Sequence, residues 1–302
     1  MKKGKQLGTL FLAFAMLLCP VCACAYEEDN STPLDTEASV SNDSVVTVSE
    51  YEMYIASKLS DVTMFSTEVP EYYNTEYILR LKTLTQYSED ELDRMGYSDG
   101  NIAIIEELKK NPSYVPTSEE LAAASATLQF TFVCSDTYMR ETETYFDFIW
   151  WFRWSDTPTQ TYTDAVVAHW LDDFFVDETT VEAEVEYSSV TLDGEDILVI
   201  KDLSTKAKNG IMPNENACEI EIPLNITKTV DGKKYQLMGY EGSGSFRLMC
   251  DLEAHSNIHI CWKYGHSSYG VTDVEVSFSD AVITFGPQTT TLAEGDRTFY
   301  VN

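Results

Sequence analysis

The sequence predicts an α+β protein: a small helical N-terminal subdomain (50–125) followed by an antiparallel β-sandwich-like domain (126–302). Two observations support this prediction. Apolar residues recur with the period of a helix up to about Ala126 and with the period of a strand after it. The later segments are short, alternate apolar with polar residues, and are separated by turn sequences such as Asp231-Gly232, which is typical of antiparallel sheets.

The first 25 residues have the pattern of a secretory signal peptide. A basic start with three Lys precedes the apolar run Leu10 to Leu18, and Ala23-Cys24-Ala25 provides a small-residue cleavage site. The run is too short to span a membrane and is followed by Pro20, so we expect cleavage and no transmembrane segment in the mature chain. The alternative is processing as a bacterial lipoprotein with Cys24 as the lipidated residue. Both routes predict a secreted or envelope-associated protein.

The chain is strongly acidic. Its 302 residues contain 50 Asp and Glu against 20 Lys and Arg, a formal net charge of −30. Such a field repels phosphate backbones, so we expect no nucleic-acid partner. A hydrophobic share of 44% indicates a folded chain. The exception is segment 26–49, which is rich in Asp, Glu, Ser and Thr and is interpreted as an acidic flexible spacer.

The helical subdomain is recognised by its capping residues. A first short helix is expected after Ser49. Ser88 and Glu91 form a capping box, Gly96 can end that helix in a left-handed conformation, and Ser98 begins the next one. A further short helix is expected from Ser118 to Ala124. The lack of a basic recognition face argues against a DNA-binding helix pair.

The segment Tyr145 to Trp154 is the most informative part of the β domain. In a strand, alternate side chains form one aromatic face, which we expect to be the core shared with neighbouring strands: Phe146, Phe148, Trp150, Phe152 and Trp154. The other face is mixed. We predict that Asp147, Trp151 and Arg153 on this mixed face belong to a ligand-binding surface.

The other strands are expected on both sides of this segment in the sequence. The segment Tyr162 to Trp170 also fits a helix, but the strand interpretation is favoured. The remaining candidates are Thr127–Cys134, Val181–Tyr187, Cys218–Ile222, Tyr235–Tyr240, Phe246–Leu252, Ile258–Tyr264, Val274–Phe278, Val282–Phe285 and Arg297–Val301.

Cysteine and histidine residues allow two kinds of cross-link. Outside the signal peptide, two disulfides are permitted in three connectivities, with buried free thiols as the alternative, among Cys134, Cys218, Cys250 and Cys261. A zinc site would draw on Cys250, His255, His259, Cys261 and His266. Strand alternation directs these side chains to different faces, so we expect neither a metal nor another cofactor.

Three short features carry a resemblance to a known group of proteins. They are Met95-Gly96-Tyr97-Ser98-Asp99 within the segment Leu92 to Ile105, the aromatic strand followed by Asp164 and Trp170, and Tyr264-Gly265-His266. Together they resemble uncharacterised exported proteins of Gram-positive bacteria. The resemblance implies export and a Gram-positive host, and it implies no activity and no site residues.

The preferred prediction of function is an exported, non-catalytic binding or interaction module of the bacterial envelope. Its partner would be a cell-wall glycan or a surface protein, and His266 is a further candidate ligand-binding residue. A secreted hydrolase acting on glycans or peptides, through carboxylates or His266, is one alternative. A structural surface protein with a protein partner is the other. No catalytic residue is assigned from the sequence.

Overall fold

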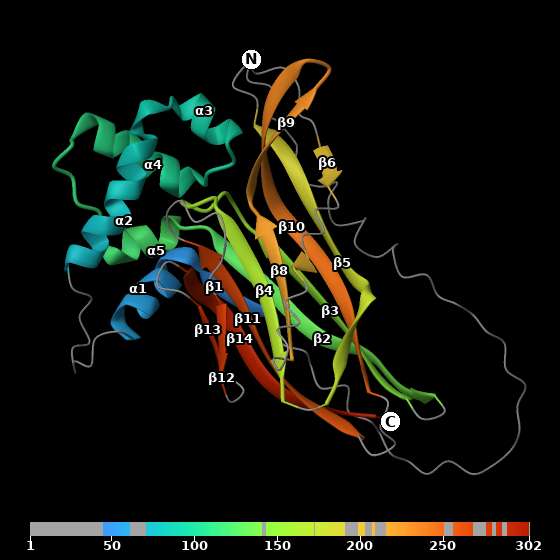
Figure 1. Ribbon diagram of the computed structural model, residues 1–302. Coiled ribbons are helices and arrows are strands. Elements are labelled where there is room, and N and C mark those ends of the chain that lie inside the picture. Colours follow the sequence, from blue (N-terminus) through green and yellow to red (C-terminus); the bar gives the residue numbers. More distant parts are fainter. Residues whose placement is uncertain are drawn as a thin grey trace, which may run out of the picture. The chain divides into compact units, whose positions relative to one another are not determined.

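The computed structural model describes residues 45–60, 71–140, 143–171, 173–190, 199–202, 207–208, 216–250, 256–267, 276–279, 282–285 and 289–301 (Figure 1). Contacts divide the chain into two units, and these residues all belong to the second, Asn42–Asn302. The predicted signal peptide, the alternative lipidation at Cys24 and residues 26–44 of the predicted spacer lie outside the described residues.

The N-terminal part of the described chain is helical, as predicted. Its elements are α1 (Glu50–Ser60), α2 (Glu71–Thr83), the 3-10 helix η1 (Leu84–Gln86), α3 (Glu89–Arg94), α4 (Asp99–Lys110) and α5 (Ser118–Ala124). The capping box of Ser88 and Glu91 is confirmed, and Ser98 accepts a hydrogen bond from the backbone N–H of Asn101 at 3.1 Å. Gly96 has φ +78° between α3 and α4. No helix in this part of the chain is long and apolar enough to cross a membrane.

The helices pack around one apolar cluster. Its buried members are Tyr51, Tyr54, Ile55, Tyr77, Ile78, Leu81, Leu84, Leu92, Tyr97, Ile102, Ile104, Ile105, Leu108, Leu121 and Ala124. The backbone N–H of Glu50 donates to the carbonyl of Ala126 at 2.9 Å, which joins the start of α1 to the start of the β region.

Sheet A is antiparallel. Its strands lie in the order β1 (Val46–Ser49), β2 (Thr127–Arg140), β3 (Glu143–Trp154), β10 (Lys233–Cys250), β5 (Phe175–Val190) and β6 (Val199–Asp202), and β9 (Asn225–Val230) also pairs with β10. Strand β1 covers the last four residues of segment 26–49, which was interpreted as a flexible spacer, so these four residues belong to sheet A.

Sheet B is also antiparallel, in the order β14 (Thr289–Tyr300), β11 (Asn257–Ser267), β4 (Thr163–Trp170), β8 (Ala217–Pro223) and β7 (Ala207–Lys208). The strand interpretation of Tyr162 to Trp170 is therefore confirmed. Strand β4 is buried on both faces. Ala165 and Val167 pack against Ile283 of the hairpin β12 (Val276–Ser279) and β13 (Val282–Phe285), while Val166 and Ala168 face sheet A.

The aromatic face of β3 forms the centre of the sandwich, as predicted. Its five rings are at most 2% exposed. Phe148 stacks on Phe132 of β2 and on Phe246 of β10, with ring centroids 5.5 and 5.4 Å apart. Phe152 reaches Tyr264 of sheet B, with centroids 5.8 Å apart. The sequence-predicted fold class, helices followed by a sandwich of antiparallel sheets, is confirmed.

Strand β10 corrects one expectation. We expected two strands, Tyr235–Tyr240 and Phe246–Leu252, separated at Glu241-Gly242-Ser243-Gly244-Ser245, but one strand runs through with two irregularities of register. The glycines leave space for large rings. A Cβ at Gly242 would lie 2.5 Å from the ring of Phe152, and one at Gly244 would lie 2.3 Å from the ring of Trp150. These glycines therefore accommodate the aromatic core and do not end the strand.

Candidate functional site

A cleft of about 640 Å³ lies where the helices meet the sandwich. Figure 1 shows the helices gathered beside the strands. The cleft walls come from η1, the α3–α4 turn, the loop between β3 and β4, and strands β8, β9 and β10. Its described lining residues are Thr83, Leu84, Gln86, Tyr87, Met95, Tyr97, Thr157, Thr159, Gln160, Thr161, Tyr162, Thr163, Glu221, Pro223, Asn225, Gln236 and Met238.

The cleft is polar but nearly uncharged. Among the described residues of its lining, Glu221 is the one acidic side chain, none is basic, and most of the others carry hydroxyl, amide or aromatic groups. Burial raises the pKa of the Tyr97 hydroxyl, so this group remains a hydrogen-bond donor at neutral pH. The lining contrasts with the strongly acidic chain around it. It offers many hydrogen bonds and, in its described part, no cation to pair with a phosphate or carboxylate.

The loop between β3 and β4 is hydrogen-bonded to the α3–α4 turn. Thr157 donates its backbone N–H to the carbonyl of Gly96 at 2.9 Å and its hydroxyl to the carbonyl of Met95 at 2.5 Å. The Tyr240 hydroxyl also donates to Met95, at 3.1 Å. A Cβ at position 96 would lie 2.0 Å from that hydroxyl oxygen, so both this close approach and the positive φ require glycine.

Three ionisable side chains are buried together beside the cleft. His266 on β11 lies opposite Asp164 on β4, and its Nδ1 is 2.7 Å from Oδ1 of Asp164. Tyr264 donates its hydroxyl to Oδ2 of Asp164 at 2.5 Å. On the other side of the imidazole, Nε2 lies 3.6 Å from Oε1 of Glu50. Glu50, His266 and Asp164, called here the buried array, are 3%, 4% and 0% exposed.

Glu50 joins the buried array to the cleft. It is the first residue of α1, and the packing of this helix carries its carboxylate into the interior. Oε1 accepts the hydroxyl of Thr159 at 2.7 Å, and Oε2 accepts the Thr159 backbone N–H at 3.0 Å and the Tyr77 hydroxyl at 3.1 Å. Because Thr159 also lines the cleft, the array is in direct contact with the cleft wall.

Electrostatics keep His266 and Glu50 charged. Burial alone would lower the pKa of His266, but the carboxylates of Asp164 and Glu50 outweigh burial and raise this pKa to about 10. Burial alone would raise the pKa of Glu50, yet His266 and the hydrogen bonds from Thr159 bring it below its ordinary value. At neutral pH, the imidazolium and the Glu50 carboxylate are therefore ionised together.

The buried array is not placed for proton transfer to a ligand. The ring of Trp154 lies 5.1 Å from the His266 ring, centroid to centroid, and Nε2 of His266 has no hydrogen-bond partner among the described residues. A general acid or base must come within about 3 Å of the proton that it moves. Since all three members are at least 96% buried, the array can hold elements together but cannot reach a molecule in the cleft.

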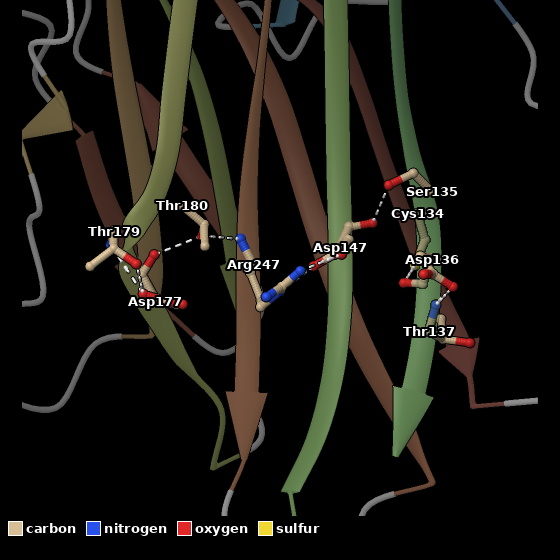
Figure 2. Close-up of polar contacts among 9 residues, drawn as sticks. All are labelled: Cys134, Ser135, Asp136, Thr137, Asp147, Asp177, Thr179, Thr180 and Arg247. Carbon is tan, nitrogen blue, oxygen red and sulfur yellow. Dashed lines mark hydrogen bonds and ion pairs between the residues drawn. The ribbon is translucent and has the colours of Figure 1, made fainter. Parts of the chain in front are cut away.

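The four residues predicted from the sequence as ligand-binding do not form one site. His266 belongs to the buried array, whereas the other three lie on the outer face of sheet A. Trp151 is 40% exposed there, and Arg153 lies 3.8 Å from Glu241. Figure 2 shows Asp147, whose carboxylate accepts two hydrogen bonds from Arg247, at 2.6 and 2.9 Å.

The Asp147–Arg247 pair joins neighbouring strands. The backbone N–H of Arg247 donates to the Thr180 hydroxyl of β5 at 2.9 Å, so contacts continue across the sheet (Figure 2). The Arg247 guanidinium also lies 5.5 and 5.6 Å from the ring centroids of Tyr138 and Tyr145. The carboxylate of Asp147 is thus engaged within the sheet.

Cysteines and metal ligands are placed as follows. The four cysteines for which disulfides were considered, Cys134, Cys218, Cys250 and Cys261, are all free thiols. Cys218 packs in the sandwich core, and Cys261 packs on the opposite face of sheet B. In the part of the chain that the structure describes, no three His, Cys, Asp or Glu side chains gather as metal ligands. His255, one of the zinc candidates, lies outside that part.

Comparison with known proteins gives distant similarities. No family model and no curated protein matches the chain. The chain is similar to the collagen-binding domain from a Staphylococcus aureus adhesin, at 8% identity over 55% of this chain and 94% of that chain, with a TM-score of 0.26. It is also similar to ACE19, the collagen-binding subdomain of the Enterococcus faecalis surface protein ACE, at 8% identity over 56% and 92%, with a TM-score of 0.21.

A third similarity is to a protein of a different kind. AvmM, which catalyses macrocyclization in alchivemycin A biosynthesis, matches at 12% identity over 58% of this chain and 88% of that chain, with a TM-score of 0.24. The similarity to Gram-positive surface adhesin domains is therefore distant, and at such TM-scores it carries no inference about function.

Sequence reasoning missed the cleft and most of the buried array. Glu50 gives no local signal, because an acidic residue in the first turn is the usual complement to the helix dipole. Asp164 does give one. It stands in a strand whose other members are almost all apolar, and a carboxylate buried in such a strand must be paired. That signal points to a partner without identifying His266.

Proposed function

We propose that this chain is an exported, non-catalytic binding module of a Gram-positive cell envelope, and that the cleft holds a neutral glycan. The observation that carries the proposal is the nearly uncharged, hydroxyl- and amide-rich lining in a strongly acidic chain. Export is supported by the pattern of residues 1–25. Neutral sugars present many hydroxyls, which pair with Thr, Gln and Asn side chains without needing a fixed charge.

The size and shape of the cleft suit a short oligosaccharide. Its volume of about 640 Å³ is within the range of about 300 to 1,000 Å³ that is common for small-ligand sites. Tyr87 and Tyr162 supply rings that can pack against the apolar faces of sugars. Gln236 and Asn225 supply amides on the opposite wall. The acidic surface repels anionic wall polymers, which favours an uncharged ligand.

Binding without cleavage is favoured over hydrolysis. Glycoside hydrolysis commonly uses two carboxyl groups about 5 to 9.5 Å apart across the sugar. The described lining of the cleft contains Glu221 and no second carboxylate, and Glu50 and Asp164 are shielded by their burial. The hydrolase alternative would need another acidic group to enter the cleft.

A surface-protein partner is the second candidate, and exposed Trp151 is the observation that favours it. Its ring is 40% exposed on the outer face of sheet A, beside Arg153. Trp and Arg are enriched where proteins bind one another. This surface is separate from the cleft, so the two candidates can be tested independently.

The test is a glycan array followed by calorimetry with the mature chain. The probes are an N-acetylglucosamine tetramer, as a neutral wall-type sugar, and a phosphate-rich wall polymer. We expect the neutral sugar to bind, and Tyr87→Ala or Gln236→Ala to weaken binding by about fivefold each, since one lost hydrogen bond or ring contact is worth about 1 kcal/mol.

The matched control is Trp151→Ala, which changes an aromatic residue outside the cleft and should leave the affinity unchanged. Binding of the phosphate polymer alone, or an array without any neutral hit, would count against the proposal. Release of shorter sugars by the wild-type chain would favour the hydrolase.

A further inference from the structure

Resting on the cleft proposed above, we infer that the buried array positions the cleft wall. The Glu50 carboxylate is paired with His266, which Asp164 holds in turn, and it fixes Thr159 and with it the loop between β3 and β4 in the arrangement that a ligand meets. Glu50, His266 and Asp164 are thereby positioning residues for binding, and none of them touches the ligand.

The first argument is the number of donors that Thr159 directs at Glu50. Both its backbone N–H and its hydroxyl donate to this one carboxylate, at 3.0 and 2.7 Å. A carboxylate has only acceptor oxygens and can take both bonds. The amide of a Gln in its place would present an NH₂ group to one of the two donors. The arrangement of Thr159 is therefore matched to a residue 50 that offers two acceptor oxygens, as an ionised carboxylate does.

The second argument is the neighbouring residue. Gln160 also lines the cleft, directly after Thr159 in the chain. With its amide oriented to satisfy its neighbours, its nitrogen donates to the carbonyl of Ser267 at 3.2 Å, and its oxygen accepts from the guanidinium of Arg80. Two consecutive wall residues thus depend on α1, α2 and β11.

The third argument is how the charge on Glu50 is maintained. Among the described residues, the titratable groups that hydrogen-bond or pair with Glu50 or with His266 and Asp164 come from three elements. Tyr77 lies on α2, Asp164 on β4, and Tyr264 with His266 on β11. Tyr77 donates to Glu50, and Tyr264 donates to Asp164, so both tyrosines stabilise carboxylates and neither competes with His266 for its proton.

A purely structural role makes a different prediction. A salt bridge that only stabilises the fold changes the free energy of unfolding without a selective effect at the cleft. A positioning role changes the cleft wall first, in a protein that is still folded. The two roles are separated by observing Thr159 directly.

The first experiment measures hydrogen exchange of the Thr159 backbone amide by NMR in the full mature chain near pH 7. In Glu50→Gln, we expect protection of this amide to fall by at least about tenfold, because hydrogen bonds to charged groups are worth about 1.5 to 3 kcal/mol. The matched control is Asp147→Asn, which weakens the ion pair of Asp147 with Arg247 on sheet A, far from the loop. It should leave the Thr159 amide protected.

Unchanged protection of Thr159 in Glu50→Gln, or an equal loss in Asp147→Asn, would overturn the positioning role. This readout needs no ligand. It therefore decides the inference even if the glycan array fails, so the failure of the proposed function and that of the positioning role are distinguishable.

The second experiment uses the N-acetylglucosamine tetramer as probe. Glu50→Gln and Thr159→Val should each weaken binding about tenfold, and the double variant should be no weaker than Glu50→Gln alone, because both changes act on the bond between the Thr159 hydroxyl and residue 50. Thr159→Ser keeps both donors and should bind like wild type. Additive losses, or a loss in Thr159→Ser as large as in Thr159→Val, would show that Thr159 acts on the sugar independently of Glu50.

Discussion

At His266, the imidazole is buried between two carboxyl groups, those of Asp164 and Glu50, and this ties stability to pH. In the unfolded chain His266 titrates near 6.5, and in the folded chain its pKa is raised to about 10. Folding is therefore favoured by its protonation. This contribution is fully present below pH 6.5 and is lost as the pH rises towards 10. We expect the free energy of unfolding to fall between pH 7 and pH 9, as measured by urea denaturation.

The comparison that isolates His266 is His266→Gln. Removing one member of a buried ion pair typically costs about 3 to 5 kcal/mol, and most of this cost should appear at pH 6. The variant should also lack the decline between pH 7 and pH 9 that we assign to this imidazole. Parallel pH profiles for wild type and variant would contradict the assignment.

Glu50 sets the acidic limit of the same stability profile. Its folded pKa lies below its ordinary value, so its contribution is present above about pH 4.5 and is lost as the pH falls further. The sequence does not reveal this residue, since its partner His266 lies more than two hundred positions away. Long-range pairing of this kind depends on how sheet B packs against α1, which no local pattern records.

At the scale of the element, strand β10 contains glycines that weaken a strand in isolation but are required by the rings packed against them. Its glycines lie against the rings of Trp150 and Phe152, and a Cβ at Gly244 would also come within 2.5 Å of the Glu182 carbonyl oxygen. We expect Gly244→Ala to destabilise the fold by about 1 to 3 kcal/mol, the usual cost of overpacking a core. Thermal or urea unfolding measures this loss.

The control for that substitution is Ser243→Ala, the adjacent residue, whose side chain points to the other face of the strand. It should change stability by no more than about 0.5 kcal/mol. If Gly244→Ala were as mild as Ser243→Ala, the glycines would not be needed to accommodate the rings.

Elements were predictable where one local signal dominated. The helix caps at Ser88 and Ser98 and the turn at Asp231-Gly232 are examples, and the turn has φ of 52° and 79° at its two residues. The continuity of β10 was not predictable, because Gly-Ser-Gly weakens a strand in isolation and is favoured here only by rings from another strand.

At the scale of the whole described chain, hydrogen bonds cross the predicted subdomain boundary near residue 125. Bonds across it include Glu50 with Thr159, Thr157 with Met95 and Tyr240 with Met95. The sequence indicated where helices end and strands begin. It could not indicate that buried charges would join the two parts, since that depends on side chains brought together from both.

These cross-contacts predict one cooperative unfolding transition, and the placement of tryptophans allows a direct test. All five Trp lie between residues 150 and 262, in the β region, so their fluorescence reports on the sandwich. Circular dichroism at 222 nm reports mainly on the helices. We expect the two urea transitions of the wild-type chain to coincide.

In Glu50→Gln the helical signal should be lost at a lower urea concentration than the fluorescence signal, because the buried array that joins the helices to the sandwich is weakened. Separate transitions already in the wild type would mean that the helices and the sandwich are stable independently.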